Sequence, residues 1–258
     1  EQAYMLSLLA GIGHRLGELN YMALLGCAHW QWTGRQSQLL ARMIDRRVDG
    51  LLMDPRPSED LLAFLDARKS RDTCPMVFID NYIPDCPVGR VLSDNRWGAA
   101  EAVKALVAAG RRRIVFFGAD PAVAALQDRY KGYCDALSAA GIARVPSRVI
   151  WRCGGEEAAL DRLGRLLRGR TRPDAIFATS FLRFLPVLEI MKELGLRHPD
   201  DLHLAGFDEP LETWAEDTVR RTVAAPLLTV VQRADVIGKL AVDMLAAAMR
   251  GSDTADAE

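Results

Sequence analysis

The stretch Val91–Gly141 reads VLSDNRWGAAEAVKALVAAGRRRIVFFGADPAVAALQDRYKGYCDALSAAG and decides the fold class. Two good N-cap residues, Asp94–Asn95, precede apolar residues at helical spacing, which predicts a helix over Arg96–Ala109. The near-continuous apolar run Ile114–Gly118 predicts a strand that is buried on both faces of a sheet. A second helix is expected over Gln127–Ala140. The stretch is therefore a strand–helix–strand–helix segment of a parallel α/β sheet.

The rest of the chain continues this alternation. Further strands are predicted at Met22–Cys27, Gly50–Met53, Pro75–Asp80, Arg90–Ser93, Arg148–Trp151, Ala175–Ala178, Leu202–Ala205 and Arg221–Ala224. Further helices are predicted at Tyr4–Leu19, Arg35–Arg47, Glu59–Lys69, Glu156–Leu167 and Ala234–Met249. Gly11, Gly13 and Gly17 imitate the glycine spacing of a dinucleotide-binding loop, but no predicted strand precedes them. We place them inside the first helix.

Composition excludes several classes of function. The chain has 258 residues, half of them hydrophobic, which is enough for one large α/β domain or two small lobes. The formal net charge of −1 gives no overall basic field to hold nucleic-acid phosphates, so these residues alone should bind DNA poorly. No serine-histidine-aspartate order, HExxH sequence, P-loop or nucleophile elbow is visible. We expect a protein that is not an enzyme and needs no cofactor or metal.

Cysteine usage and hydropathy indicate the compartment. The five cysteines are an odd number and widely spaced without a CxxC pair, so they predict neither a disulfide framework nor a zinc site. Reduced cysteines are typical of the cytoplasm. No apolar run reaches the roughly 20 residues of a membrane span, and no secretory signal opens the chain. We expect a cytoplasmic protein without membrane contact.

Several motifs together resemble a known family. The patterns VxxDNxxGAxxA, GRRRI and RxxGYxxALxxAGI, with RRVDGLL at 46–52 and AGFD at 205–208, resemble the effector-binding core of LacI/GalR-type transcription regulators. That core is similar to periplasmic sugar-binding proteins, in which two α/β lobes with parallel sheets are joined by crossover strands and close on a ligand. The resemblance covers most of the chain. Thr179–Ser180, where many members have Asn-Asp, is similar to the branch that senses fructose phosphates and sucrose.

The resemblance implies a division of the chain. One lobe is expected to comprise residues 1–92 with 232–250, the other residues 93–231, and residues 251–258 form a tail. In the family a helix-turn-helix and one central strand precede the first helix, and neither is present in this sequence. Without that strand, we expect two interior strand edges to remain unpaired. The family pairs its cores in twofold dimers, so we also expect a homodimer.

Three candidate ligand residues follow predicted strands. Open parallel sheets bind ligands at the carboxyl ends of their strands, where the sequence places Trp30, Asp80 and Asp208. Trp30 offers an aromatic face to a sugar ring, or else packs at a domain surface or dimer contact. Asp80 offers a carboxylate to sugar hydroxyls, or else caps the next turn.

Three further residues complete the predicted site. Thr179 and Ser180 end a strand and open a helix, where their hydroxyls bind a sugar or an anion, or serve as ordinary N-caps. Arg129 occupies the RxxG motif, and the resemblance implies that it binds effector oxygens; the alternative is a solvent-facing helix arginine. The branch often has Asp-Arg where this chain has Asp80 and Asn81, so one expected phosphate partner is absent.

Two functional classes fit these residues. The first is the effector-sensing core of a bacterial transcription regulator, which binds a small sugar or sugar phosphate between its lobes and transmits this to operator DNA through a domain outside this sequence. The second is a sugar-binding receptor of a transport system with the same fold. The scattered free cysteines, the VxxDNxxGA stretch and RRVDGLL favour the regulator.

Overall fold

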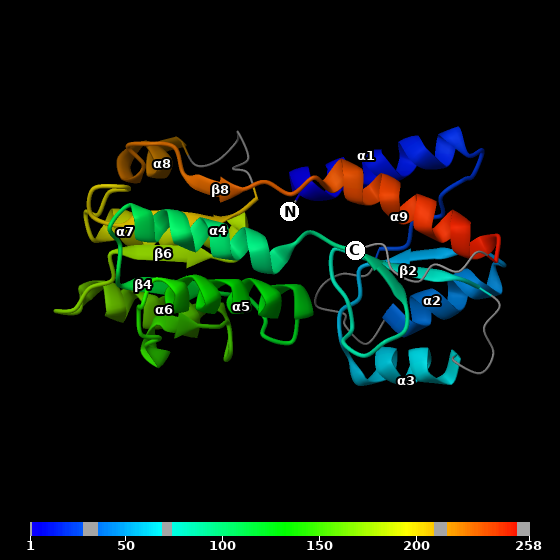
Figure 1. Ribbon diagram of the computed structural model, residues 1–258, viewed down its shortest axis with the longest axis horizontal. Helices are drawn as coiled ribbons and strands as arrows, with labels where there is room; N and C mark the ends of the chain where they lie inside the picture. The colour runs from blue at the N-terminus through cyan, green and yellow to red at the C-terminus, as the bar shows by residue number, and fades with distance from the viewer. Residues whose placement is uncertain (1, 28–35, 69–73, 209–215, 252–258) are drawn as a thin grey trace. The chain divides into compact units, whose positions relative to one another are not determined.

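The computed structural model describes residues 2–27, 36–68, 74–208 and 216–251 and confirms the predicted α/β class with parallel sheets (Figure 1). The chain forms two compact units. Unit 1 comprises Asp94–Ala122 and Leu126–Gln232, and unit 2 comprises Gln2–Ser93, Val123–Ala125 and the residues from Arg233 onward. Unit 2 is therefore assembled from both ends of the chain.

Unit 1 is built on a five-stranded parallel sheet of order β5-β4-β6-β7-β8. The strands are β4 (Ile114–Phe117), β5 (Val149–Ile150), β6 (Ala175–Ala178), β7 (His203–Phe207) and β8 (Leu228–Val230). Every residue of β4 and β6 is buried, because helices cover both faces of the sheet. Because both faces of these strands are buried, successive residues are apolar, which explains the continuous apolar runs that predicted the strands.

Two pairs of helices cover the faces of this sheet (Figure 1). Helices α4 (Asn95–Ala108) and α5 (Ala124–Ala139) pack on one face, and α6 (Glu156–Arg168) and α7 (Phe184–Glu193) pack on the other. Helix α8 (Glu216–Thr222) lies against α7. Two short 3₁₀ helices, η2 (Pro146–Arg148) and η3 (Phe181–Arg183), precede β5 and α7.

A glycine sets the distance between α4 and α5. A Cβ atom on Gly132 of α5 would lie 2.1 Å from the carbonyl oxygen of Arg96 in α4. Any side chain at position 132 would therefore force the two helices apart. The glycine of the RxxG motif is a packing requirement, and this packing fixes the position of Arg129 one turn earlier on α5.

Unit 2 contains a three-stranded parallel sheet of order β1-β2-β3 among the described residues. The strands are β1 (Leu51–Met53), β2 (Met76–Ile79) and β3 (Gly89–Val91). Helices α1 (Gln2–Glu18) and α9 (Ala234–Met249) pack on one face, and α2 (Gln36–Asp45) and α3 (Glu59–Arg68) pack on the other. Strand β2 alternates between them: Val77 and Ile79 contact the α1/α9 side, and Phe78 contacts the α2/α3 side.

Two predicted strands are wrong. Residues 21–27 follow α1 but join no sheet, and Met22 is 96% exposed. A strand needs a hydrogen-bonded neighbour, and none of the described strands pairs with this segment. In the segment predicted as a strand at Arg221–Ala224, the first two residues end α8 and Val223 forms only an isolated parallel bridge with His198. The Thr222 hydroxyl donates to the Thr218 carbonyl at 2.6 Å, a bond that is typical of helical geometry.

Neither membrane nor metal features appear in the described ranges. None of the helices there has the length and apolar character needed to span a bilayer. Within the same ranges, no group of three or more histidine, cysteine, aspartate or glutamate side chains is arranged to hold a metal ion.

Candidate functional site

The candidate site lies at the carboxyl ends of β6 and β7 in unit 1. Thr179 directly follows β6 and Asp208 directly follows β7, and these two strands are neighbours in the sheet. Arg129 reaches the same edge from α5, because its guanidinium donates a hydrogen bond to the Thr179 carbonyl. Three predicted residues from distant parts of the sequence therefore meet at one sheet edge.

Arg129 is the centre of a hydrogen-bond network. Its side chain is buried, with only 5% of the residue exposed, so the alternative of a solvent-facing arginine is wrong. Nε donates to Asn95 Oδ1 at 2.7 Å, and an Nη2 proton is directed at Gln232 Oε1 at 3.2 Å. Each donor of a buried charge needs an acceptor, and these neutral oxygens supply acceptors without cancelling the charge.

An aromatic ring supports the guanidinium. The central carbon of Arg129 lies 3.8 Å from the centroid of the Phe207 ring, which is fully buried. This is the geometry of a cation–π contact, which favours retention of the positive charge. The ring and the hydrogen bonds together hold the fork of donors in one orientation.

Asp208 is linked to this network through Gln232. The Gln232 amide donates to Asp208 Oδ1 at 2.5 Å while its oxygen accepts from Arg129. None of the described residues bonds to the second carboxylate oxygen of Asp208. Its backbone has a φ of +72°, a left-handed conformation that aspartate tolerates better than most residues. A strained backbone at a strand end is common in ligand sites.

Thr179 and Ser180 have different environments. Thr179 is fully buried, its N–H donates to the Phe117 carbonyl at 3.1 Å, and no described residue accepts from or donates to its hydroxyl. Ser180 is half-buried, and its carbonyl accepts from the Arg183 N–H at 3.0 Å as η3 begins. The buried Thr179 hydroxyl needs a partner that the described residues do not provide, which a ligand or water can be.

One of the two remaining candidates, Asp80, belongs to the other compact unit. Asp80 ends β2 in unit 2, is half-buried, has a φ of +66° and makes no side-chain hydrogen bond or ion pair with the described residues. It therefore repeats, at the carboxyl edge of the second sheet, the conformation of Asp208. Asn81 beside it is buried and donates to the Pro55 carbonyl at 2.7 Å. Trp30 lies outside the described residues.

Sequence reasoning missed three members of the network: Asn95, Phe207 and Gln232. Asn95 was interpreted as a helix cap, but Asp94 performs that role by accepting from the Trp97 N–H at 2.9 Å. Asn95 is instead 4% exposed and bonded to Arg129. The Asp-Asn pair in the VxxDNxxGA motif was the available signal. One polar residue is enough to cap the helix, so the second polar residue indicates another role.

This site offers both hydrogen-bond donors and acceptors. It presents a buried guanidinium, a carboxylate with one unbonded oxygen and two hydroxyls, which complement the hydroxyl and anionic groups of a polar small molecule. Within the described part of the network, no serine, cysteine or lysine nucleophile is hydrogen-bonded to a base, as covalent catalysis requires.

Known proteins share both the sequence and the fold. A family model described as periplasmic binding protein-like domain matches residues 103–258. The ribose operon repressor of Haemophilus influenzae is 29% identical over 214 residues, which are 82% of this chain and 60% of the relative. The chain thus spans about 60% of the length of this curated relative.

Solved structures of transcription regulators share the fold of this chain. A putative ribose operon repressor from Burkholderia thailandensis has a TM-score of 0.81 at 26% identity, covering 98% of this chain and 90% of that one. A LacI family regulator from Mycobacterium smegmatis has a TM-score of 0.79 at 28% identity, covering 98% and 88%. A complex of the transcriptional regulator CelR with cellobiose has a TM-score of 0.78 at 25% identity, covering 96% and 73%.

These matches confirm the predicted resemblance at the level of the family. The family model covers more than half of the chain, and the similar proteins are transcription regulators. The chain therefore belongs to the periplasmic-binding-protein-like domain family, and the proteins that it resembles include LacI-family transcription regulators.

Proposed function

We propose that this chain is the effector-sensing part of a bacterial DNA-binding transcription regulator, which acts in the cytoplasm. The observation that carries the proposal is the buried network in which Arg129 connects the ends of β6 and β7 to Gln232. Gln232 is the last residue of unit 1 before the chain returns to unit 2. A ligand that bonds to Asp208 or Thr179 therefore acts on groups directly linked to a crossing segment.

The proposed effector is a small sugar or sugar phosphate. The candidate binding residues are Trp30, Asp80, Arg129, Thr179, Ser180 and Asp208. Carboxylates accept from sugar hydroxyls, and a guanidinium donates to hydroxyl or phosphate oxygens. The similar CelR structure is a complex with cellobiose, which supports a sugar as the ligand class. Thr179–Ser180 supports a member close to the branch that senses fructose phosphates and sucrose.

The proposed partners are operator DNA and a second copy of the chain. The similar proteins are repressors and regulators, and this chain spans about 60% of the first of them. DNA contact is assigned to a domain outside the sequence, because the formal net charge of −1 provides no broad attraction for phosphates. The ligand would change DNA affinity by binding the two states of the core with different strength.

Calorimetry on two site variants and one control variant tests the site. The ligand is first identified by thermal shift with a panel of sugars and sugar phosphates, since a ligand at 100 times its dissociation constant adds about 2.7 kcal/mol of stability. Arg129→Gln and Asp208→Asn should then each weaken binding by at least tenfold, because charged hydrogen bonds contribute about 1.5–3 kcal/mol. Asparagine retains the tolerance for positive φ, so Asp208→Asn removes charge without backbone strain.

The matched control is Asp135→Asn. Asp135 is an exposed α5 aspartate paired with Arg96 at 2.6 Å, outside the network. It should bind the ligand like the wild type. Unchanged affinity in both site variants would show that the ligand binds elsewhere. Operator binding by the full-length regulator, measured with and without the ligand, tests the coupling; equal affinities would contradict the regulatory role.

A further inference from the structure

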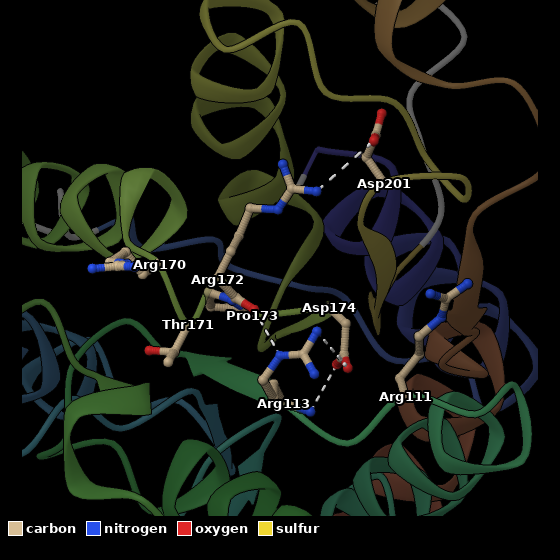
Figure 2. A pocket seen from close by; sticks show the side chains of 8 residues that line it. All are labelled: Arg111, Arg113, Arg170, Thr171, Arg172, Pro173, Asp174 and Asp201. Atoms are coloured by element: carbon tan, nitrogen blue, oxygen red, sulfur yellow. Dashed lines mark hydrogen bonds and ion pairs between the residues drawn. The ribbon is translucent and has the colours of Figure 1, made fainter.

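A polar pocket lies at the edge of the unit 1 sheet opposite the Arg129 network. Its volume is about 460 Å³, and it is lined by residues that directly precede β4, β6 and β7 (Figure 2). The charged lining residues are Arg111, Arg113, Arg170, Arg172, Asp174 and Asp201. The amino ends of these strands form it, whereas the carboxyl ends form the Arg129 network, so the two sites share no residue.

The two carboxylates of this pocket are already engaged. Asp174 accepts from the backbone N–H groups of Arg112 and Arg113, with distances of 2.7–3.2 Å, and pairs with the Arg113 side chain at 3.4 Å. Asp201 accepts from the Arg197 N–H at 3.0 Å and lies 3.9 Å from the Arg172 guanidinium (Figure 2). Neither carboxylate is available to the remaining arginines.

Two arginines of the pocket therefore have no counter-charge among the described residues. No carboxylate of the described chain lies within ion-pair distance of Arg111 or Arg170, and Figure 2 shows no bond to either side chain. The lining carries four guanidinium groups against two carboxylates, a formal excess of positive charge. Such an excess on a concave surface attracts anions.

A buried donor points to the same conclusion. Arg111 Nε is inaccessible to solvent and has no hydrogen-bond partner in the described part of the chain. Guanidinium donors that are buried without an acceptor are rare in folded proteins, because the lost hydration is not replaced. The positive field also reaches His203: burial and the nearby Arg111 charge lower the pKa of this imidazole.

We propose that this arginine pocket is a second ligand site, which binds a phosphate-type oxyanion, either free or as the phosphoryl group of a small molecule. A phosphoryl group carries between one and two negative charges and three acceptor oxygens, which match several guanidinium forks better than a single carboxylate does. The site is independent of the sugar site proposed above. It gives the regulator a way to sense phosphate or a phosphorylated metabolite in addition to its effector.

The test is calorimetry with inorganic phosphate at constant ionic strength. The double variant Arg111→Gln/Arg170→Gln should weaken phosphate binding by at least tenfold, since two charged donor groups are lost. Its fold should be retained, because neither side chain bonds to a described residue. Arg165→Gln is the matched control: this arginine is exposed on α6, pairs with Asp161 at 3.0 Å and lies outside the pocket. It should bind phosphate like the wild type.

Three further titrations distinguish the sources of the anion. Glycerol 3-phosphate should bind at least as tightly as inorganic phosphate, and both should be weakened in the double variant. Chloride that competes at equal concentration would show general ion attraction and overturn the proposal. The proposal would also be overturned if a short DNA duplex bound the wild type more tightly than phosphate does and bound the double variant only weakly. The pocket would then be a nucleic-acid contact. Equal phosphate affinity in the wild type and the double variant, or no binding to either, would also overturn it. If the double variant proves unstable, Arg170→Gln alone should still weaken phosphate binding.

Discussion

At the scale of single residues, Arg129 combines a structural and a binding role. Its guanidinium bonds to a side-chain amide of α4, to the Thr179 carbonyl and to Gln232. Arg129→Lys keeps the charge but loses the planar fork, so it cannot bond to all three acceptors. We expect the free energy of unfolding to fall by about 1.5–3 kcal/mol, as measured by urea denaturation. A change within 0.5 kcal/mol would show that a lysine reaches the same partners.

A buried histidine predicts the dependence of stability on pH. His198 is 3% exposed; its Nδ1 accepts from the Leu204 N–H at 3.0 Å, and its Nε2 lies 3.3 Å from the Pro226 carbonyl. The ring is therefore neutral with its proton on Nε2. Burial lowers the pKa of His198 below its ordinary value of 6.5, and the Arg111 charge acts in the same direction. The backbone carbonyls nearby and Asp200 oppose the shift but do not reverse it.

The sign of this effect follows from proton linkage. Because the folded pKa is depressed, the unfolded chain binds the proton more readily, and the free energy of unfolding falls as the pH drops through 6.5. Urea denaturation between pH 7.5 and 5.5 should show this loss, and His198→Gln should reduce it. An equal slope in the wild type and in His198→Gln would contradict the assignment.

Residue identity predicted the site only in part. Arg129, Thr179 and Asp208 were predicted from motif and strand position, and the structure brings them to one edge. Gln232 was not predicted, because nothing in the sequence around it shows that it bridges Arg129 and Asp208, which lie 103 and 24 positions away. Such bridges depend on tertiary packing. The ligand roles of these residues stay predictions.

At the scale of elements, the contact between α1 and α9 depends on glycine. A Cβ atom on Gly11 would lie 2.1 Å from the Asp235 carbonyl oxygen, and one on Gly238 would lie 2.6 Å from the Leu8 carbonyl oxygen. The two backbones therefore touch at this crossing. Arg15 and Asp243 add an ion pair at 2.6 Å between the same helices. The glycines that imitate a dinucleotide loop in the sequence belong to a helix, as predicted, and one of them is a packing contact.

Two alanine substitutions on α1 should have opposite effects. Gly11→Ala forces the helices apart and should lower the free energy of unfolding by about 1–3 kcal/mol. Gly13→Ala, in the same helix with nothing within 4 Å of the added Cβ, should raise it by roughly 0.5–1 kcal/mol through helix propensity. Thermal denaturation of both variants measures the difference. Stabilisation by Gly11→Ala would show that the crossing is looser than described.

Helices and buried strands were predictable, and exposed or solitary segments were not. Strand β6 and helix α9 have the predicted bounds, because continuous burial and amphipathic spacing leave a direct signal in the sequence. The apolar residues 21–27 carry the signal of a strand, yet they join no sheet among the described residues. The hydrophobic pattern of a segment indicates that it is suited to form a strand. Whether it joins a sheet depends on whether a neighbouring strand is present to pair with it.

At the scale of the whole molecule, we expect a homodimer in solution. Unit 2 exposes large apolar side chains on both helices of its α1/α9 pair: Leu6 is 67% exposed and Leu240 is 51% exposed. A twofold interface would bury the same side chains from both copies. Light scattering at micromolar concentration should give twice the chain mass, and Leu6→Glu/Leu240→Glu should give a monomer. A monomeric wild type, or a dimer unaffected by the substitutions, would contradict this interface.

The divided architecture has a consequence for synthesis on the ribosome. Unit 1 is complete once Gln232 has emerged, but the core of unit 2 still lacks Ile237, Ala241 and Leu245 of α9 at that moment. Helix α1 therefore remains exposed to solvent until α9, the helix that it packs against, has been translated. Unit 1 should therefore fold first and, once folded, shorten the loop that separates Ser93 from Arg233. A released chain that ends at residue 232 should show a protease-resistant unit 1 beside a sensitive amino-terminal segment.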